Sequence, residues 1–206
     1  MIALVDYGMG NRRSVEKALE RVGAEPLLTD DHERIALADG VVVPGVGAFP
    51  EGMRRLRESG LDEVLRERAA AGRPLLGICL GMQLLFDSSD EHDGASGLGL
   101  VPGGVEALRA PGLKLPHIGW NRVAWERSSP LTEGLGEAAA FYHVHSFAAR
   151  PADGEDVLGR GEYGAPFVSA IARGEVYGVQ FHPEKSSAAG LRLLANFTAI
   201  CARTPA

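Results

Sequence analysis

Residues 73–86 have the sequence RPLLGICLGMQLLF. The apolar run at 74–78 predicts a buried strand, and the run at 80–87 predicts the helix that follows it. Cys79 stands at their junction, with glycines two residues before and two residues after it. This spacing is typical of a nucleophile elbow, a tight turn that holds the nucleophile in a strained conformation, here with sulfur in place of a hydroxyl. The simpler alternative is a small buried core cysteine.

Short apolar strands alternate with helices through the N-terminal half of the chain. Helical spacing of apolar residues begins near Val15 and stops at Gly23, and a longer helical pattern covers 50–71. Strands are predicted at 2–6, 25–30, 40–45 and 74–78. Strand and helix units in succession predict an α/β fold with a mostly parallel central sheet that is flanked by helices on both faces.

The second half of the chain changes character near residue 88. Loops rich in Gly, Ser and Asp separate short strand candidates, which lie at 103–109, 121–125, 139–149, 166–174 and 175–184. Their short connections predict an antiparallel or mixed extension of the same sheet. An amphipathic helix over 186–203 closes the chain, and we expect residues 1–206 to form a single domain.

The bulk composition indicates an ordinary soluble globular protein. The 206 residues are 45% hydrophobic and 23% charged, and the net charge of −6 gives no indication of nucleic-acid binding. The apolar runs are too short to span a membrane, and the first residues lack the charged start of a secretory signal. We therefore expect a cytoplasmic protein without membrane contact, whose two cysteines, Cys79 and Cys201, form no disulfide.

A thiol nucleophile needs a base and a group that orients the base. Both are present in the segment GVQFHPEKS at 178–186, where His182 and Glu184 stand two positions apart beyond an apolar strand. In an extended backbone such side chains point to the same side, and Pro183 between them stiffens the segment. We therefore predict a catalytic triad of Cys79, His182 and Glu184, although the His-Pro-Glu sequence alone would indicate a surface turn.

Acyl transfer also needs donors that face the developing oxyanion. One predicted donor is the N–H of Leu80, directly after the nucleophile. The other is the peptide of Val46, because the strand at 40–45 ends in Pro-Gly-Val-Gly and the glycines leave that peptide free to turn. An ordinary Pro-Gly turn is the alternative, while the location at the carboxyl end of a parallel strand favours a ligand site.

Three motifs together resemble class I, triad-type glutamine amidotransferases: PGVG at 44–47, GICLGMQ at 77–83 and VQFHPE at 179–184. The resemblance covers essentially the whole chain, and the order of Cys before His and Glu differs from that of α/β-hydrolases. Three further motifs resemble the glutaminase subunits of imidazole glycerol phosphate synthase, from histidine biosynthesis: DYGMGN at 6–11, PHIGWN at 116–121 and YHVHSF at 142–147.

The resemblance implies the reaction and the residues that serve it. Cys79 attacks the glutamine amide, ammonia leaves a γ-glutamyl thioester, and water then releases glutamate. His182 acts as base and then as acid, and Glu184 orients it. The residues implied to bind glutamine are Gly45, Gly47, Gln83, Glu91, Ser146 and Phe147. The family often has an aromatic hydroxyl where this chain has Phe147, and no cofactor is implied.

The resemblance also implies a partner, a separate cyclase subunit with a (β/α)8 barrel that receives the ammonia within a heterodimer. Asn11, Trp120 and Lys185 resemble family positions that face the cyclase. The simpler alternatives are a helix cap for Asn11, core packing for Trp120 and a solvated charge for Lys185. If the carbonyl of the Val46 peptide faces the site at rest, glutamine is barely hydrolysed until liganded cyclase turns that peptide.

Other interpretations of the same residues stay open. The glutaminase chemistry also serves pyridoxal phosphate, anthranilate or guanylate synthesis; the fold suits a scaffold with an inactive site; and a cysteine hydrolase of γ-glutamyl peptides is a third candidate. His143 and His145 are two apart on a predicted strand but lack a third ligand at suitable spacing, so we expect no metal site. Cys201 lies on the last helix without flanking glycines, and we expect it to be inert.

Overall fold

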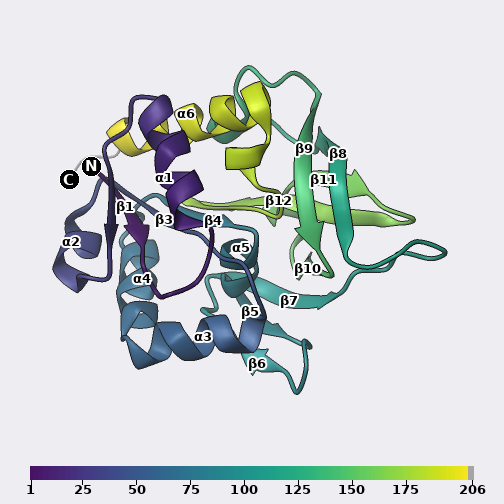
Figure 1. Cartoon of the computed structure of the whole chain (residues 1–206), viewed down its shortest axis with the longest axis horizontal. Helices are drawn as coiled ribbons and strands as arrows, with labels where there is room; N and C mark the ends of the chain where they lie inside the picture. The colour runs from purple at the N-terminus through teal and green to yellow at the C-terminus, as the bar shows by residue number, and fades with distance from the viewer. Residues whose placement is uncertain (204–206) are drawn as a thin grey trace.

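A parallel sheet forms the half of the molecule that contains β1 to β4 (Figure 1). The structure is a computed structural model and describes residues 1–203, so the end of the predicted domain, 204–206, lies outside the described residues. The parallel strands lie in the order β2-β1-β3-β4-β13, with bounds β1 Ile2–Val5, β2 Pro26–Thr29, β3 Gly40–Val43, β4 Leu75–Ile78 and β13 Val176–Val179. All residues of β1, β3, β4 and β13 are buried, which explains their continuous apolar composition.

Helices cover both faces of this parallel sheet, as the sequence predicts. On one face α1 (Arg12–Arg21) and α6 (Ser187–Arg203) pack their apolar side chains against Ile2 and Leu4 of β1. On the other face the core residues Ala3 and Val5 meet the remaining helices, which are α2 His32–Leu37, α3 Phe49–Glu58, α4 Leu61–Ala70 and α5 Leu80–Leu84. Figure 1 shows the two helical layers above and below the strands.

The predicted mixed extension of the sheet is confirmed. Strand β12 pairs antiparallel with β13, and the sheet continues through β10, β7, β5 and β6, while β11, β8 and β9 branch from β12. The bounds are β5 Phe86–Ser89, β6 Ala95–Ser96, β7 Val101–Ala107, β8 His117–Trp125, β9 Ala138–His145, β10 Phe147–Pro151, β11 Val157–Glu162 and β12 Pro166–Arg173. The candidate at 139–149 is therefore two strands, separated at Ser146.

One helical prediction in the region before β4 needs correction, and one helix there is not predicted by the sequence pattern. The pattern over 50–71 is two helices, α3 and α4, because Gly60 adopts a φ of 69°, a left-handed conformation that ends α3 and starts a new axis. Helix α2 was not predicted, since only Ile35 among its six residues is buried. Its start is fixed locally, where the Asp31 side chain accepts a hydrogen bond from the N–H of Arg34 at 3.0 Å.

The predicted helix over 80–87 is wrong in its second half. Helix α5 ends at Leu84, and β5 begins at Phe86. The carbonyl of Leu84 accepts from the N–H of Leu98, and the carbonyl of Leu85 accepts from the N–H groups of Leu100 and Val101. These long-range bonds replace the next helical turn, which the apolar sequence alone does not reveal. Within residues 1–203, no helix combines the length and the hydropathy needed to cross a membrane.

Candidate active site

Cys79 occupies the sharp turn between β4 and α5 that the glycine spacing predicts. Its backbone has φ 55° and ψ −112°, a positive φ that is strained for any residue with a side chain. A Cβ at Gly81 would lie 1.9 Å from the carbonyl oxygen of Val43, and one at Gly77 would lie 2.6 Å from the carbonyl oxygen of Gly81. Only glycine fits at either position, so the turn can pack against the end of β3.

His182 reaches Cys79 because their strands are neighbours in the sheet. Strands β4 and β13 run parallel with Val179 opposite Ile78, and the N–H of Cys79 donates to the carbonyl of Val179 at 2.8 Å. Both strands therefore end at the same edge of the sheet, where the side chain of Cys79 contributes to a raised pKa of His182. On the other side of the ring, Nδ1 of His182 lies 2.9 Å from Oε1 of Glu184. Both side chains are buried, at 5% and 1% exposure.

The backbone that joins His182 to Glu184 differs from the extended pair predicted from the sequence. Residues Pro183–Lys185 form a short 3-10 turn (η3), in which the N–H of Lys185 donates to the carbonyl of His182 at 3.0 Å. The hydroxyl of Ser186 donates to the same carbonyl at 2.6 Å and accepts from the N–H of Tyr142. The predicted contact between the two side chains is nevertheless made, by a turn that Ser186 ties to β9.

The environment of the imidazole favours its protonated form. Burial lowers the pKa of His182, but the hydrogen bonds and charges of Cys79 and Glu184 outweigh this effect and raise the pKa to about 10. A protonated imidazole at this position can give a proton to a leaving group, and in its neutral form it can take the proton of the candidate nucleophile Cys79.

A cavity of about 220 Å³ opens beside Cys79 and can hold a small substrate. The lining residues that the sequence predicts are Val46, Gly47, Leu80, Gln83, Glu91, Ser146 and Phe147. Gly45, also predicted, belongs to the same loop but is not among the lining residues; a Cβ there would meet the Tyr7 hydroxyl at 2.6 Å and Leu80 Cβ at 2.8 Å. The sequence reasoning did not identify three further lining residues, Pro116, Val144 and His145.

The residues of the two predicted oxyanion donors line the same cavity as Cys79. Leu80 is the first residue of α5, so its N–H has no acceptor within the helix and is free to face the cavity. Val46 is 51% exposed at the cavity mouth, in the loop that follows β3. Gly47 next to it has a φ of 127°, a conformation that favours glycine and gives the Val46 peptide its freedom to rotate.

Gln83 and Glu91 are held by contacts to the cavity wall. Nε2 of Gln83 donates to the carbonyl of Phe147 at 3.3 Å and to Oε1 of Gln180 at 3.0 Å, and Gln180 in turn donates to Cys79 Sγ at 3.7 Å. Oε2 of Glu91 accepts from the N–H of Phe49 at 2.7 Å, which ties the cavity to the start of α3. These contacts fix both polar side chains before any ligand binds.

The family model described as glutamine amidotransferase class-I matches residues 3–201. The chain belongs to the class-I glutamine amidotransferase family. The imidazole glycerol phosphate synthase subunit HisH of Bacillus cereus (strain G9842) is 51% identical over 200 residues, covering 97% of this chain and 95% of that protein. The subunit HisH of Moorella thermoacetica is 51% identical over 196 residues, covering 95% and 93%.

Solved structures share the fold of this amidotransferase at lower sequence identity. A structure described as PurLQS from Thermotoga maritima has a TM-score of 0.77 and 22% identity, and covers 96% of this chain and 97% of that one. A second, described as a glutamine amidotransferase, has a TM-score of 0.75 and 22% identity, with coverage of 98% and 100%. The family and the fold class predicted from the sequence motifs are therefore confirmed.

Three buried histidines form a cluster at the cavity of the amidotransferase, which one of them, His145, lines. His145 Nδ1 lies 2.8 Å from the carbonyl oxygen of Phe147, and its Nε2 lies 3.0 Å from Nδ1 of His117. His143 contacts the hydroxyl of Ser169 at 2.8 Å. Burial lowers the pKa of all three rings, that of His145 to about 4. Within residues 1–203, no group of three His, Cys, Asp or Glu residues is placed to hold a metal ion.

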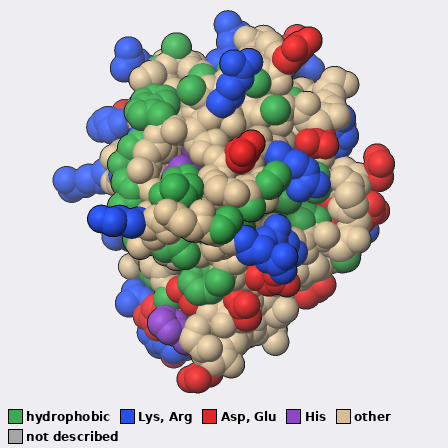
Figure 2. Space-filling model, turned by 90° about the vertical axis from the view of Figure 1, so that its right-hand side faces the viewer, with side chains coloured by type: hydrophobic (Ala, Val, Ile, Leu, Met, Phe, Trp, Pro, Cys, Tyr) green, Lys and Arg blue, Asp and Glu red, His purple; other side chains and the backbone are tan. Residues whose placement is uncertain are grey.

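Two of the three predicted partner residues of the amidotransferase, Trp120 and Lys185, lie around Tyr142 on the surface. Trp120 is 55% exposed and packs edge-on against the Tyr142 ring, and Lys185 Nζ lies 6.0 Å from the centre of that ring. The core-packing alternative for Trp120 is therefore wrong. Asn11 precedes α1, but its side chain makes no capping hydrogen bond to any residue in 1–203. Figure 2 views the side of β8 and β11 and shows hydrophobic side chains exposed among charged ones.

Proposed function

We propose that this chain is the glutaminase subunit of imidazole glycerol phosphate synthase. The observation that carries the proposal is the pair that His182 forms with Glu184, 2.9 Å from Nδ1 to Oε1, at the sheet edge where Cys79 occupies the elbow and raises the pKa of the ring. Two further facts support it. The cavity beside the sulfur is lined by both proposed oxyanion residues, Val46 and Leu80, and HisH subunits are 51% identical over almost the whole chain.

The proposed reaction proceeds through a covalent intermediate. The Cys79 thiolate attacks the side-chain amide carbon of glutamine, so that a C–S bond forms and the carbonyl oxygen becomes negative. The N–H groups of Leu80 and Val46 stabilise this charge. His182 gives its proton to the amide nitrogen, the C–N bond breaks, and ammonia leaves a thioester. His182 then takes a proton from water, whose oxygen displaces the sulfur and yields glutamate.

The surface around Tyr142 is the proposed docking site for a (β/α)8-barrel cyclase, which would consume the ammonia. Trp120 at 55% and Ile118 at 59% exposure offer apolar area on β8, and Lys185 adds a positive charge. Exposed aromatic residues of this kind are typical of interface anchors. The same partner is proposed to turn the Val46 peptide into its donating orientation and so to activate the site. We also expect a cytoplasmic location.

The proposal is tested by reconstituting glutamine-dependent synthase activity with the cyclase subunit. Wild type should support the reaction, while Cys79→Ala should lose it, because no thioester can form. The Cys79→Ala complex should still use free ammonia, because the sulfur takes no part in the cyclase step. If wild type hydrolyses glutamine but does not support this synthase, the acceptor is another one; if it hydrolyses only γ-glutamyl peptides without a partner, the proposal is wrong.

A further inference from the structure

The loop that carries Val46 is fixed at its upstream end by a tyrosine from another strand. Tyr7 follows β1, is 4% exposed, and donates its hydroxyl to the carbonyl of Pro44 at 2.6 Å. Pro44 is the first residue of the Pro-Gly-Val-Gly loop, two positions before Val46. This buried bond fixes the peptide between Pro44 and Gly45, and the proline ring already restricts the backbone on its other side.

The backbone next to Tyr7 also packs directly on this loop. A Cβ at Gly10 would lie 3.2 Å from both N and Cα of Gly45, so glycine allows the two backbones to approach closely. Cε of Met9 lies 2.6 Å from the position of a Cβ at Gly47. The segment at 6–11 therefore covers the loop from Gly45 to Gly47 along its length.

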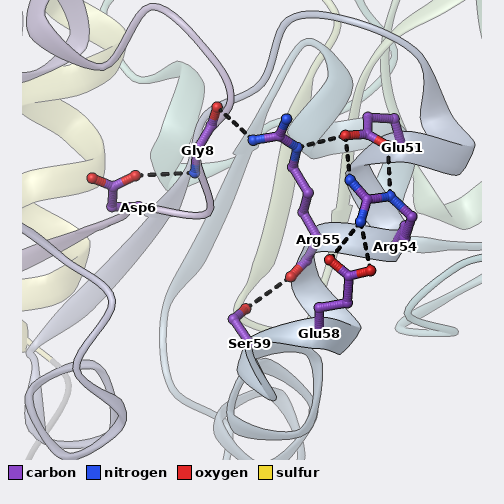
Figure 3. Close-up of polar contacts among 7 residues, drawn as sticks. All are labelled: Asp6, Gly8, Glu51, Arg54, Arg55, Glu58 and Ser59. Carbon is purple, nitrogen blue, oxygen red and sulfur yellow. Dashed lines mark hydrogen bonds and ion pairs between the residues drawn. The ribbon is translucent and has the colours of Figure 1, made fainter.

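Helix α3 is hydrogen-bonded to the segment at 6–11 through Arg55 and Gly8 (Figure 3). Nη1 of Arg55 donates to the carbonyl of Gly8 at 3.2 Å, and Nε of Arg55 is paired with Glu51 Oε1 at 2.7 Å. The N–H of Gly8 donates to Oδ1 of Asp6 at 3.0 Å. Helix α3 begins at Phe49, directly after the loop. The loop is therefore linked to the segment at 6–11 twice, through the Tyr7–Pro44 bond at its start and through the Arg55–Gly8 bond from the helix that follows it.

The downstream end of the loop is fixed as well. The N–H of Phe49 donates to the Glu91 carboxylate at 2.7 Å. Rotation of the backbone is therefore confined to the residues between Pro44 and Phe49, where Gly45 and Gly47 supply the freedom. A peptide that turns between two fixed ends can present its N–H in one reproducible direction.

We propose that Tyr7 is a positioning residue for oxyanion stabilisation, whose hydroxyl anchors Pro44 so that rotation is confined to the short loop that presents the Val46 peptide to the site. This inference rests on the proposed glutaminase function. A donor that acts on the oxyanion contributes in the transition state and little in the bound substrate. Loss of the anchor should therefore lower kcat and leave KM for glutamine unchanged, the signature of an interaction made only in the transition state.

The test compares Tyr7→Phe with Tyr177→Phe in complex with the liganded cyclase. Tyr177 is a matched control, since it is also buried and its hydroxyl contacts Glu175, on the face of the sheet packed against α6. Tyr7→Phe should lower kcat for glutamine about tenfold, with KM within about twofold of wild type; complete loss of a donor costs about 100- to 1000-fold. Tyr177→Phe should keep the wild-type kcat.

Two further measurements separate an effect on the loop from an effect on the thiol or on folding. Alkylation of Cys79 by iodoacetamide is a displacement at saturated carbon that develops no oxyanion, so its rate should be the same in Tyr7→Phe and wild type. Tyr7→Phe should also co-elute with the cyclase in gel filtration as wild type does, which shows that the variant is folded and docked.

The outcomes distinguish this inference from the function on which it rests. If wild type turns over glutamine and Tyr7→Phe has the kcat of Tyr177→Phe, the inference alone is wrong. It is equally overturned if KM rises while kcat holds, or if alkylation or complex formation with the cyclase falls in parallel with kcat. If wild type in the complex does not turn over glutamine, the proposed function fails and the role of Tyr7 fails with it.

Discussion

Replacing Glu184 by Gln tests the electrostatic basis of the triad. The substitution keeps the shape of the side chain and removes the charge that lies 2.9 Å from His182 Nδ1. Because the carboxylate is 1% exposed, water cannot replace it at the ring. A hydrogen bond between charged groups contributes roughly 1.5–3 kcal/mol, and since 1.36 kcal/mol changes a rate tenfold, kcat should fall about 10- to 150-fold.

The pH profile gives a second and more specific result. In wild type, burial lowers the pKa of His182, and Cys79 and Glu184 raise it to about 10. Above that pH the ring loses the proton that, in the proposed mechanism, it gives to the amide nitrogen before ammonia leaves. The value of kcat should therefore fall on the alkaline side. In Glu184→Gln one raising contribution disappears while burial remains, and this alkaline limb should therefore move to lower pH by about one unit or more.

The assay is glutamate release by the complex with liganded cyclase, measured from pH 6 to 10.5. Glu58→Gln serves as the control, because Glu58 is 62% exposed at the end of α3 and pairs with Arg54. A Glu184→Gln enzyme with wild-type kcat and an unmoved alkaline limb would refute the role of the carboxylate. Equal losses in both variants would mean that the change in total charge, and not the local contact, determines the rate.

Two other predictions concern stability. Burial lowers the pKa of His145 to about 4, so between pH 6.5 and 4 the unfolded chain binds a proton that the folded chain does not. The free energy of unfolding should therefore decrease as the pH is lowered through this range. In urea titrations, His145→Gln should reduce this acid-induced loss by about 3 kcal/mol. Gly81→Ala places a Cβ 1.9 Å from the Val43 carbonyl and should cost at least about 3 kcal/mol and abolish glutamine turnover. In the control Gly72→Ala, the Cβ meets open space among the described residues, and only the φ of 67° costs about 1–2 kcal/mol; equal stability losses would contradict the clash.

The sequence was most informative where local chemistry determines local structure. Apolar runs located the parallel strands, and the glycines around Cys79 predicted a turn whose φ is 55°. The contact between His182 and Glu184 was predicted from a spacing of two. The backbone reason was wrong, however, because a 3-10 turn held by Ser186 makes the contact.

The remaining errors share one physical cause, which is that distant segments supply hydrogen bonds that a local pattern does not contain. Helix α5 ends early because Leu98 and Leu100 take up its carbonyls. The sequence does not indicate the contact of Tyr7, because its partner, Pro44, is 37 positions away. His145 was considered only as a metal ligand, although its position on β9 lines the cavity. A lone aromatic or histidine carries no signal of this kind until the pairing of strands is known.

The order of strands explains why these distant residues meet in one site. Strands β3, β4 and β13 are neighbours, all parallel, and each is followed by one part of the site at the carboxyl edge: Pro44 after β3, Cys79 after β4 and His182 after β13. Strand β1, on the other side of β3, is followed by Tyr7 at the same edge. Since all four strands end at the same edge of a buried sheet, the sheet positions the proposed nucleophile, its proposed base and the proposed oxyanion loop before substrate or partner binds.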